Sequence, residues 1–183
     1  MEAAKYIDGQ KILKIIGIVI TGSVLLTISA KIKIPFYPVP MTMQTFVVIL
    51  LGIALGSKIA LASVSLYLLE GALGLPVFSN SPEKGVGLVY FTGPTMGYLI
   101  GFLFSTFMAG YLNLKNNFFV IFIKLLLCVS IIYILGIFWL GNLIGWEKPI
   151  FELGAKPFLL AELFKLLILT LIAKKVIKIR KFI

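Results

Sequence analysis

The feature that most constrains this chain is a series of long apolar segments with few charged residues inside them. A transmembrane helix needs about 20 apolar residues, with a range of ~17–25, to cross a bilayer. The six segments are residues 12–30, 41–55, 59–75, 94–112, 119–140 and 157–173. The sequence therefore predicts an all-α integral membrane protein, with six transmembrane helices in a single domain over residues 1–183.

The composition of the chain supports this class. Hydrophobic residues make up 60% of the sequence, whereas soluble domains contain about 45–50%. A soluble domain of this size buries only about two-thirds of its chain surface, so it could not hide so many apolar side chains. A multi-span protein places them against lipid instead. No small-residue cleavage site follows the first apolar segment, which we therefore expect to be a retained span.

The second and third segments are short and are separated only by Gly56, Ser57 and Lys58. One interpretation is a tight helical hairpin, and the other is a single long tilted helix. A Gly-Ser pair at the midpoint favours the hairpin, because these residues commonly interrupt a helix.

The basic residues predict an orientation in the membrane. With six spans, both termini lie on one side, which carries eleven of the seventeen Lys and Arg residues, whereas the other side carries five. The excess of basic residues marks the cytoplasmic side, so both termini are predicted to be cytoplasmic. This distribution also explains the net charge of +10 as membrane orientation, and no nucleic-acid surface is expected.

The three predicted outer connections are long and rich in aromatic residues, Pro and Gly. Pro35, Pro38 and Pro40 favour an extended chain in the first of them, since each proline also disfavours helix at the preceding residue. Such loops on a helical scaffold are typical of the cover over a pocket, which we expect near the outer face.

Small residues recur every four positions in the fourth segment, where they predict a helix face that another backbone can approach closely. They are Gly93, Gly97, Gly101, Ser105 and Ala109. We favour packing inside the bundle over a subunit interface. The first segment has two weaker pairs, Gly17 with Thr21 and Ser23 with Thr27, which suit internal packing and a partner equally well. Cys128 lies within an apolar run and is interpreted as a buried structural thiol.

The sixth segment carries Glu162 and Lys165, which are three residues apart and so lie on the same face of a helix. A charge at bilayer depth costs about 2.5–3.5 kcal/mol on insertion scales. Three interpretations remain open: a substrate or ion site, which we favour, an ion pair that merely assists insertion, and a proton relay. Glu70, near the outer end of the third segment, is interpreted as a rim residue without a role.

The sequence lacks the parts that catalysis commonly uses. It contains no His, no zinc-ligand spacing, no phosphate-binding Gly-rich loop and no G-x-S-x-G elbow. We therefore expect no enzyme activity, no metal and no cofactor, and any energy from ATP must come from another protein.

Several motifs together resemble the BioY family, the biotin-binding S components of energy-coupling factor (ECF) transporters. The resemblance covers about residues 34–173. Its marks are Pro-Val-Pro at residues 38–40 with Thr42, Gln44 and Thr45 after it, GALGLPVF at residues 71–78, GPTMGYLIGF at residues 93–102 and KPFLLAELFK at residues 156–165.

This resemblance implies one biotin bound near the outer face, with Glu162 and Lys165 bonded to its polar groups. Asn80 matches a family asparagine that contacts the ring, and Gln44, Phe78 and Tyr90 are further candidates by position and chemistry. It also implies a transmembrane coupling subunit and ATPases as partners.

Two departures from the family pattern bear on these expectations. The family acid is usually aspartate, so Glu162 has one more methylene with which to reach the ligand. The alanines expected on the coupling face of the first helix are absent. The sequence leaves open an autonomous or proton-coupled carrier, with Glu162 titrating, and a structural scaffold. It does not decide between a single chain, a homo-oligomer and an ECF module.

Overall fold

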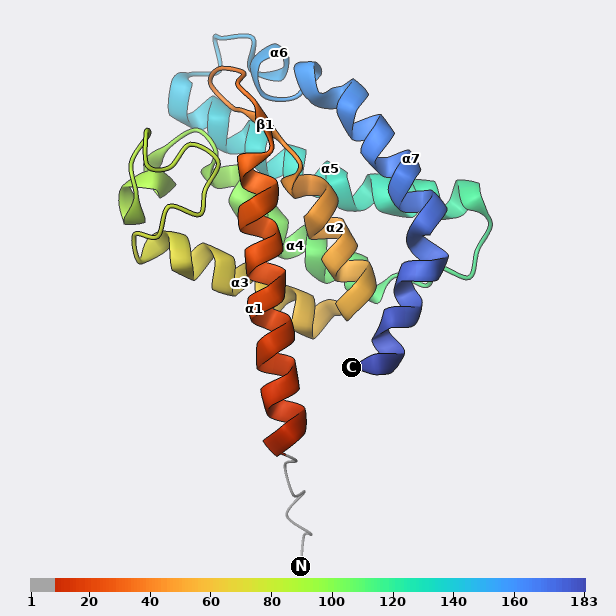
Figure 1. The fold of residues 1–183 in the computed structure, drawn as a ribbon. Helices are drawn as coiled ribbons and strands as arrows, with labels where there is room; N and C mark the ends of the chain where they lie inside the picture. Colours follow the sequence, from red (N-terminus) through yellow and green to blue (C-terminus); the bar gives the residue numbers. More distant parts are fainter. Residues whose placement is uncertain (1–8) are drawn as a thin grey trace, which may run out of the picture.

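The computed structural model describes residues 9–183 and is almost entirely helical (Figure 1). The α-helices are α1 (Gly9–Lys31), α2 (Gln44–Leu55), α3 (Ser57–Ala72), α4 (Met96–Tyr111), α5 (Phe118–Ile144), α6 (Ile150–Gly154) and α7 (Leu159–Val176). Short 3₁₀ helices are η1 (Gly87–Thr92), η2 (Lys156–Phe158) and η3 (Ile177–Phe182). Each of the six apolar segments overlaps one long helix, and the five-residue α6 lies outside all of them.

The chain between α1 and α2 contains a short hairpin that hydropathy does not predict. Strand β1 (Lys33–Ile34) pairs antiparallel with β2 (Met41–Thr42). The second predicted segment was therefore wrong over its first three residues, and α2 begins at Gln44. Three prolines lie between the strands or at their edge, where they cannot continue a helix, so the chain turns back over the end of the bundle.

The second and third segments form the predicted helical hairpin. Gly56 separates α2 from α3 with a φ of 77°, a conformation that residues with a β-carbon rarely adopt. The same glycine donates its N–H to Gly52 O at 3.1 Å and so closes α2. A single tilted helix is thereby excluded.

Helix α4 is the central helix of the bundle and packs against α5, α2 and α3. Gly97 and Gly101 lie directly against the backbone of α5, and a β-carbon on Gly101 would meet Ile132 Cα at 2.7 Å. Ser105 donates to Cys128 O at 2.7 Å, and both residues are buried. The prediction of internal packing is confirmed for Gly97, Gly101, Ser105 and Ala109, whereas Gly93 lies before α4, at the end of η1.

The two weaker small-residue pairs of α1 differ from one another. Gly17 and Thr21 are exposed, whereas Ser23 is buried against α3. The Ser23 hydroxyl donates a hydrogen bond to Glu70. Glu70 is half-buried, so it ties α3 to α1 rather than standing free at a rim.

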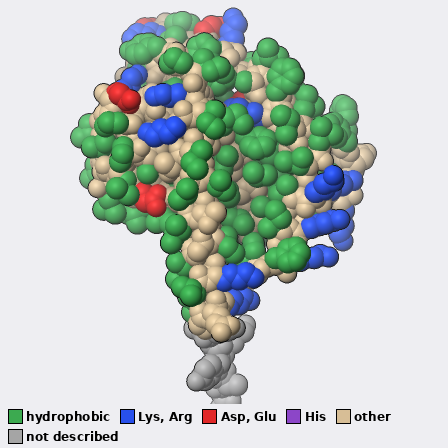
Figure 2. Space-filling model, in the orientation of Figure 1, with side chains coloured by type: hydrophobic (Ala, Val, Ile, Leu, Met, Phe, Trp, Pro, Cys, Tyr) green, Lys and Arg blue, Asp and Glu red, His purple; other side chains and the backbone are tan. Residues whose placement is uncertain are grey.

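Much of the visible surface is apolar, and the Lys and Arg side chains gather toward its ends (Figure 2). Exposed side chains such as Ile20, Ile28, Ile134 and Phe138 line the outer faces of α1 and α5. These two helices are long and apolar enough to cross a bilayer. The start of α1 and the C-terminus lie at the same end of the molecule, away from the hairpin (Figure 1).

Candidate functional site

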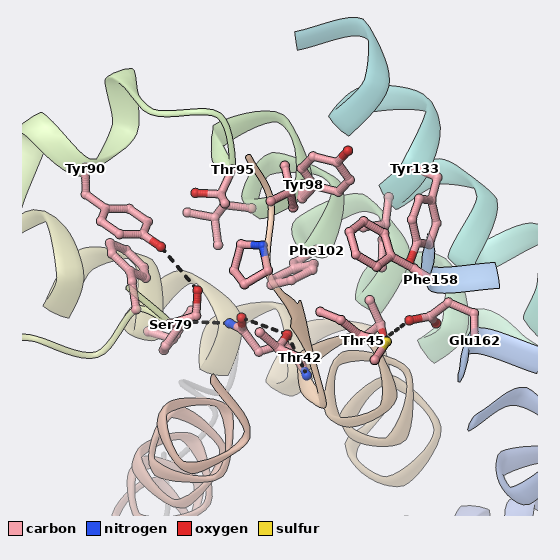
Figure 3. Close-up of a pocket in the computed structure, with 18 residues that line it drawn as sticks. Thr42, Thr45, Ser79, Tyr90, Thr95, Tyr98, Phe102, Tyr133, Phe158 and Glu162 are labelled. Atoms are coloured by element: carbon pink, nitrogen blue, oxygen red, sulfur yellow. Dashed lines mark hydrogen bonds between the residues drawn. The ribbon is translucent and has the colours of Figure 1, made fainter. Parts of the chain in front are cut away.

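A pocket lies beneath the β1–β2 hairpin and the connection between α3 and α4 (Figure 3). The cavity that the lining side chains leave open is about 50 Å³. It is lined by Val39, Pro40, Met41, Thr42, Gln44, Thr45, Tyr67, Phe78, Ser79, Tyr90, Thr95, Tyr98, Leu99, Phe102, Ile132, Tyr133, Phe158 and Glu162. Every long helix except α1 contributes to this wall.

Glu162 and Lys165 form a buried ion pair at one side of the pocket. Lys165 Nζ lies 2.7 Å from Glu162 Oε1, and the two residues are 7% and 5% exposed. Thr45 joins the pair from α2: its hydroxyl donates to Glu162 Oε1 at 2.8 Å and accepts from Lys165 Nζ at 3.0 Å. The sequence prediction that the two charged residues share a face of α7 is confirmed.

The remaining hydrogen-bonding capacity of this pair is uneven. Lys165 Nζ also donates to Thr42 O at 2.6 Å, so all three of its N–H donors have protein partners. Glu162 Oε2, in contrast, is buried without a hydrogen-bond partner. A buried carboxylate oxygen left unsatisfied is costly. The site therefore offers a free acceptor to any ligand that brings an N–H or O–H group.

Aromatic rings line both ends of the pocket. The Phe78 ring stacks on Tyr90 with centroids 4.5 Å apart and meets Tyr67 edge-on at 5.3 Å. Phe158 lies beside Tyr133, with centroids 6.3 Å apart, on the Glu162 side. Figure 3 shows Tyr90 and Glu162 at opposite ends of the cavity. Such walls suit a ligand with an apolar body and polar groups at defined positions.

Polar groups are also placed among these aromatic rings. Gln44 Nε2 donates to the Tyr67 hydroxyl at 2.8 Å, and the hydroxyls of Ser79 and Tyr90 lie 3.4 Å apart. The side-chain Oε1 of Gln44 accepts a hydrogen bond from the Thr42 hydroxyl at 3.2 Å. These groups are prearranged by bonds to one another, which reduces the entropy lost on binding.

A second, larger hollow opens between α5 and α7. It holds about 630 Å³ and is lined almost entirely by apolar residues, with Tyr133 and Glu162 shared with the first pocket. The carboxylate of Glu162 thus lies where the central pocket approaches the apolar outer surface. No group of three His, Cys, Asp or Glu side chains suited to a metal occurs in residues 9–183.

The structure brings four of the six candidates to the pocket wall: Gln44, Phe78, Tyr90 and Glu162. Lys165 lies behind that wall and reaches it through Glu162 and Thr45. Asn80 is not among the lining residues, and its Oδ1 accepts from Lys33 Nζ at 3.1 Å.

The sequence prediction did not single out Thr45, Tyr98, Tyr133 or Phe158 as site residues, although all four line the pocket. Thr45 belongs to the motif after Pro-Val-Pro, where its position gave a signal. Tyr98 and Tyr133 carry a hydroxyl inside otherwise apolar helices, which is a weaker indication of a site than the position of Thr45 in a motif. Phe158 belongs to the KPFLLAELFK motif, but its residue type adds no further signal, because phenylalanine is common throughout this chain.

Comparison with known proteins gives one consistent relationship. The family model described as the BioY family matches residues 4–182. A probable biotin transporter BioY of Pyrococcus horikoshii is 36% identical over 151 residues, covering 82% of this chain and 88% of the relative. The biotin transporter BioY of Thermotoga maritima is 38% identical over 156 residues, covering 85% and 90%.

A solved structure shares the fold. It is a crystal structure of the S-component for biotin from an ECF-type ABC transporter, and it superposes with a TM-score of 0.77 at 25% sequence identity. The alignment covers 94% of this chain and 95% of the other. The fold described above is thus that of a known transporter subunit.

Proposed function

The chain belongs to the BioY family, and from this membership we propose that it captures biotin as the substrate-specific subunit of an ECF transporter. The family is one of transporters, not enzymes, and the chain is a multi-pass membrane protein. Two relatives at 36% and 38% identity are named biotin transporters, and the solved structure with the same fold is an S-component for biotin.

The observation that carries the proposal is the unpartnered, buried oxygen of Glu162 at the pocket wall. The ureido ring of biotin presents two N–H donors and a carbonyl acceptor. Glu162 Oε2 accepts one of these N–H groups, and the site gains a hydrogen bond to a charged acceptor that the empty pocket lacks. Such bonds are stronger than those between neutral groups.

Lys165 is proposed to bond the ligand as well, but only by exchanging a partner. Its three donors are engaged by Thr42 O, Thr45 Oγ1 and Glu162 Oε1. A biotin oxygen that reaches Nζ replaces one of these acceptors. Gln44, Phe78 and Tyr90 supply an amide and two aromatic faces for the rest of the ligand, and Asn80 contacts it only after a change in its bond to Lys33.

The orientation proposed for the chain places the pocket outside and both termini in the cytoplasm. Eleven basic residues on the side of the termini, against five on the other, support this orientation. The chain carries no phosphate-binding Gly-rich loop. Uptake therefore depends on a transmembrane coupling subunit and ATPases, which supply the conformational energy.

Binding of biotin by the purified protein in detergent tests the capture step. We expect tight binding that Glu162→Gln and Lys165→Ala each weaken strongly. Glu152→Gln is a matched control, because Glu152 is an exposed carboxylate in α6 outside the pocket lining. An intact protein that binds no biotin, or variants that bind as the control does, would contradict the proposal.

Uptake in cells separates ATP-driven capture from the autonomous or proton-coupled alternative. Dependence on co-expressed coupling proteins is expected from an S component. Uptake that proceeds without them, and collapses with the proton gradient and in Glu162→Gln, would favour the carrier instead.

A further inference from the structure

One wall of the pocket is built by a loop rather than by a helix. Phe78 and Ser79 line the cavity from the connection between α3 and η1. Phe78 is only 1% exposed, and Ser79 and Ser81 are buried too. Since loop backbone lacks the repeating hydrogen bonds of a helix, the position of these side chains depends on what holds the loop.

Two lysines outside the pocket hold the backbone of this loop. Lys31, the last residue of α1, donates from Nζ to Phe78 O at 2.8 Å and to Ser81 O at 2.9 Å. Lys33, in β1, donates to Ser79 O at 2.6 Å and to Asn80 Oδ1 at 3.1 Å. The two ammonium groups therefore engage three backbone carbonyls within four residues.

The contacts of these two lysines differ from those of ordinary surface lysines. Both residues are exposed overall, yet their charged ends bond to the backbone carbonyls of the buried residues Phe78, Ser79 and Ser81. Within residues 9–183, neither lysine lies within ion-pair distance of a carboxylate, since Glu162 with Lys165 is the one salt bridge there. Hydrogen bonds from a charged donor are roughly twice as strong as neutral ones.

Lys33 also connects the two segments that cover the pocket, which are the β1–β2 hairpin and the loop that carries Phe78 and Ser79. Lys33 is the register partner of Thr42 in the hairpin, and Thr42 lines the cavity. Lys33 thus joins the hairpin to the loop that carries Phe78 and Ser79. A displacement of either cover would be transmitted to the other through this ammonium group.

We infer that Lys31 and Lys33 are positioning residues for ligand binding, which hold the Phe78–Ser81 backbone so that Phe78 and Ser79 form the pocket wall. The inference rests on the proposed function for its ligand, biotin. The lysines act through the loop and not by touching the ligand, so their loss opens the wall and speeds ligand release. Association, which is limited by encounter and orientation, changes less.

The test measures biotin association and dissociation rates for the full chain in detergent. Lys31→Met and Lys33→Met keep an unbranched side chain but remove the donors. We expect each to weaken binding about tenfold or more, chiefly through faster dissociation, since a bond to a charged group is lost. Lys31→Arg keeps the charge and the donors, so it should bind within about threefold of the wild type.

Lys148→Met is the matched control. Lys148 is exposed at the same end of the proposed topology, and its side chain makes no hydrogen bond or ion pair with the described residues. This variant removes the same charge from the outer surface without releasing a carbonyl. Wild-type rates in Lys31→Met and Lys33→Met, or losses equal to that of Lys148→Met, would overturn the inference.

Hydrogen–deuterium exchange of the ligand-free protein tests the positioning without biotin. The loop has its own amide hydrogen bonds, from Ser81 N to Phe78 O, Lys84 N to Asn80 O and Gly85 N to Pro82 O. We expect these amides to exchange faster in Lys31→Met and Lys33→Met and unchanged in Lys148→Met. If the wild type binds no biotin, the proposed function fails. Exchange then decides alone whether the lysines hold the loop, and unchanged exchange in Lys31→Met and Lys33→Met would refute that inference.

Discussion

Replacing Lys165 by methionine should destabilise the protein far more than its single charge suggests. The substitution removes hydrogen bonds to Thr42 O, Thr45 Oγ1 and Glu162 Oε1. It also leaves Glu162, which is 5% exposed, as an uncompensated buried carboxylate. Breaking a buried ion pair in this way costs about 3–5 kcal/mol.

The double variant Glu162→Gln/Lys165→Met separates the cost of an unpaired charge from the loss of contacts. Because neither charge remains, we expect it to recover most of the stability lost in Lys165→Met, while biotin binding stays weak. The coupling energy between the two positions should be at least about 2 kcal/mol, within the range of neighbouring residues in one network.

Unfolding in mixed micelles at increasing denaturing detergent measures these free energies for the wild type, both single variants and the double variant. Lys156→Met serves as the control, because Lys156 is exposed and at the start of η2. Losses that simply add, to within about 0.5 kcal/mol, would refute the reasoning. The ion pair would then contribute nothing that depends on both partners.

Three further predictions concern packing and binding. Gly101→Leu should lower the thermal unfolding temperature sharply, since its new β-carbon would lie 2.7 Å from an α-carbon of α5. Gly17→Leu should leave that temperature nearly unchanged, because nothing lies within 4 Å of the new β-carbon. Equal effects of the two substitutions would contradict the packing described. Phe78→Ala should weaken biotin binding at least about tenfold, because the Phe78 ring lines the pocket and stacks on Tyr90 there. Phe107→Ala, at a 42% exposed position, should bind normally in the same assay. Arg180→Met should lower the free energy of unfolding in micelles by about 2–3 kcal/mol, because hydrogen bonds of 2.8 and 2.9 Å to two carbonyls at the end of α2 are lost. An unchanged unfolding curve would show that these two bonds do not stabilise the protein.

Much of the helical framework was predictable because apolar segments of this length follow from local composition. The predictions of a helical hairpin at Gly56 and of internal packing at Gly97 and Gly101 were also correct. A glycine affects the backbone conformation and the packing distance at its own position, so its effect can be predicted locally. The β1–β2 hairpin was missed. Its two strands have two residues each and pair across a loop rich in proline, so no periodicity signals them.

The site was predictable only in part. Glu162 with Lys165 stood out because two charges in an apolar helix are rare, and the ion pair formed as their spacing indicated. The motif drew attention to Thr45, but its hydrogen bond to Glu162 could not be predicted, because Glu162 is 117 residues away. The loop contacts of Lys31 were equally invisible, since nothing local distinguishes a lysine in water from one bonded to a distant carbonyl.

By itself, the sequence determined that this protein is a bundle of apolar helices with two charges at one end of the last long helix. Hydropathy is additive along the chain, and in lipid every backbone group must be bonded within its own helix, so local composition suffices. Only the tertiary structure decided that Lys165 has all its donors engaged, that Glu162 has one oxygen without a partner, and that a loop completes the pocket. Those facts depend on distances between residues far apart in the chain, which packing alone determines.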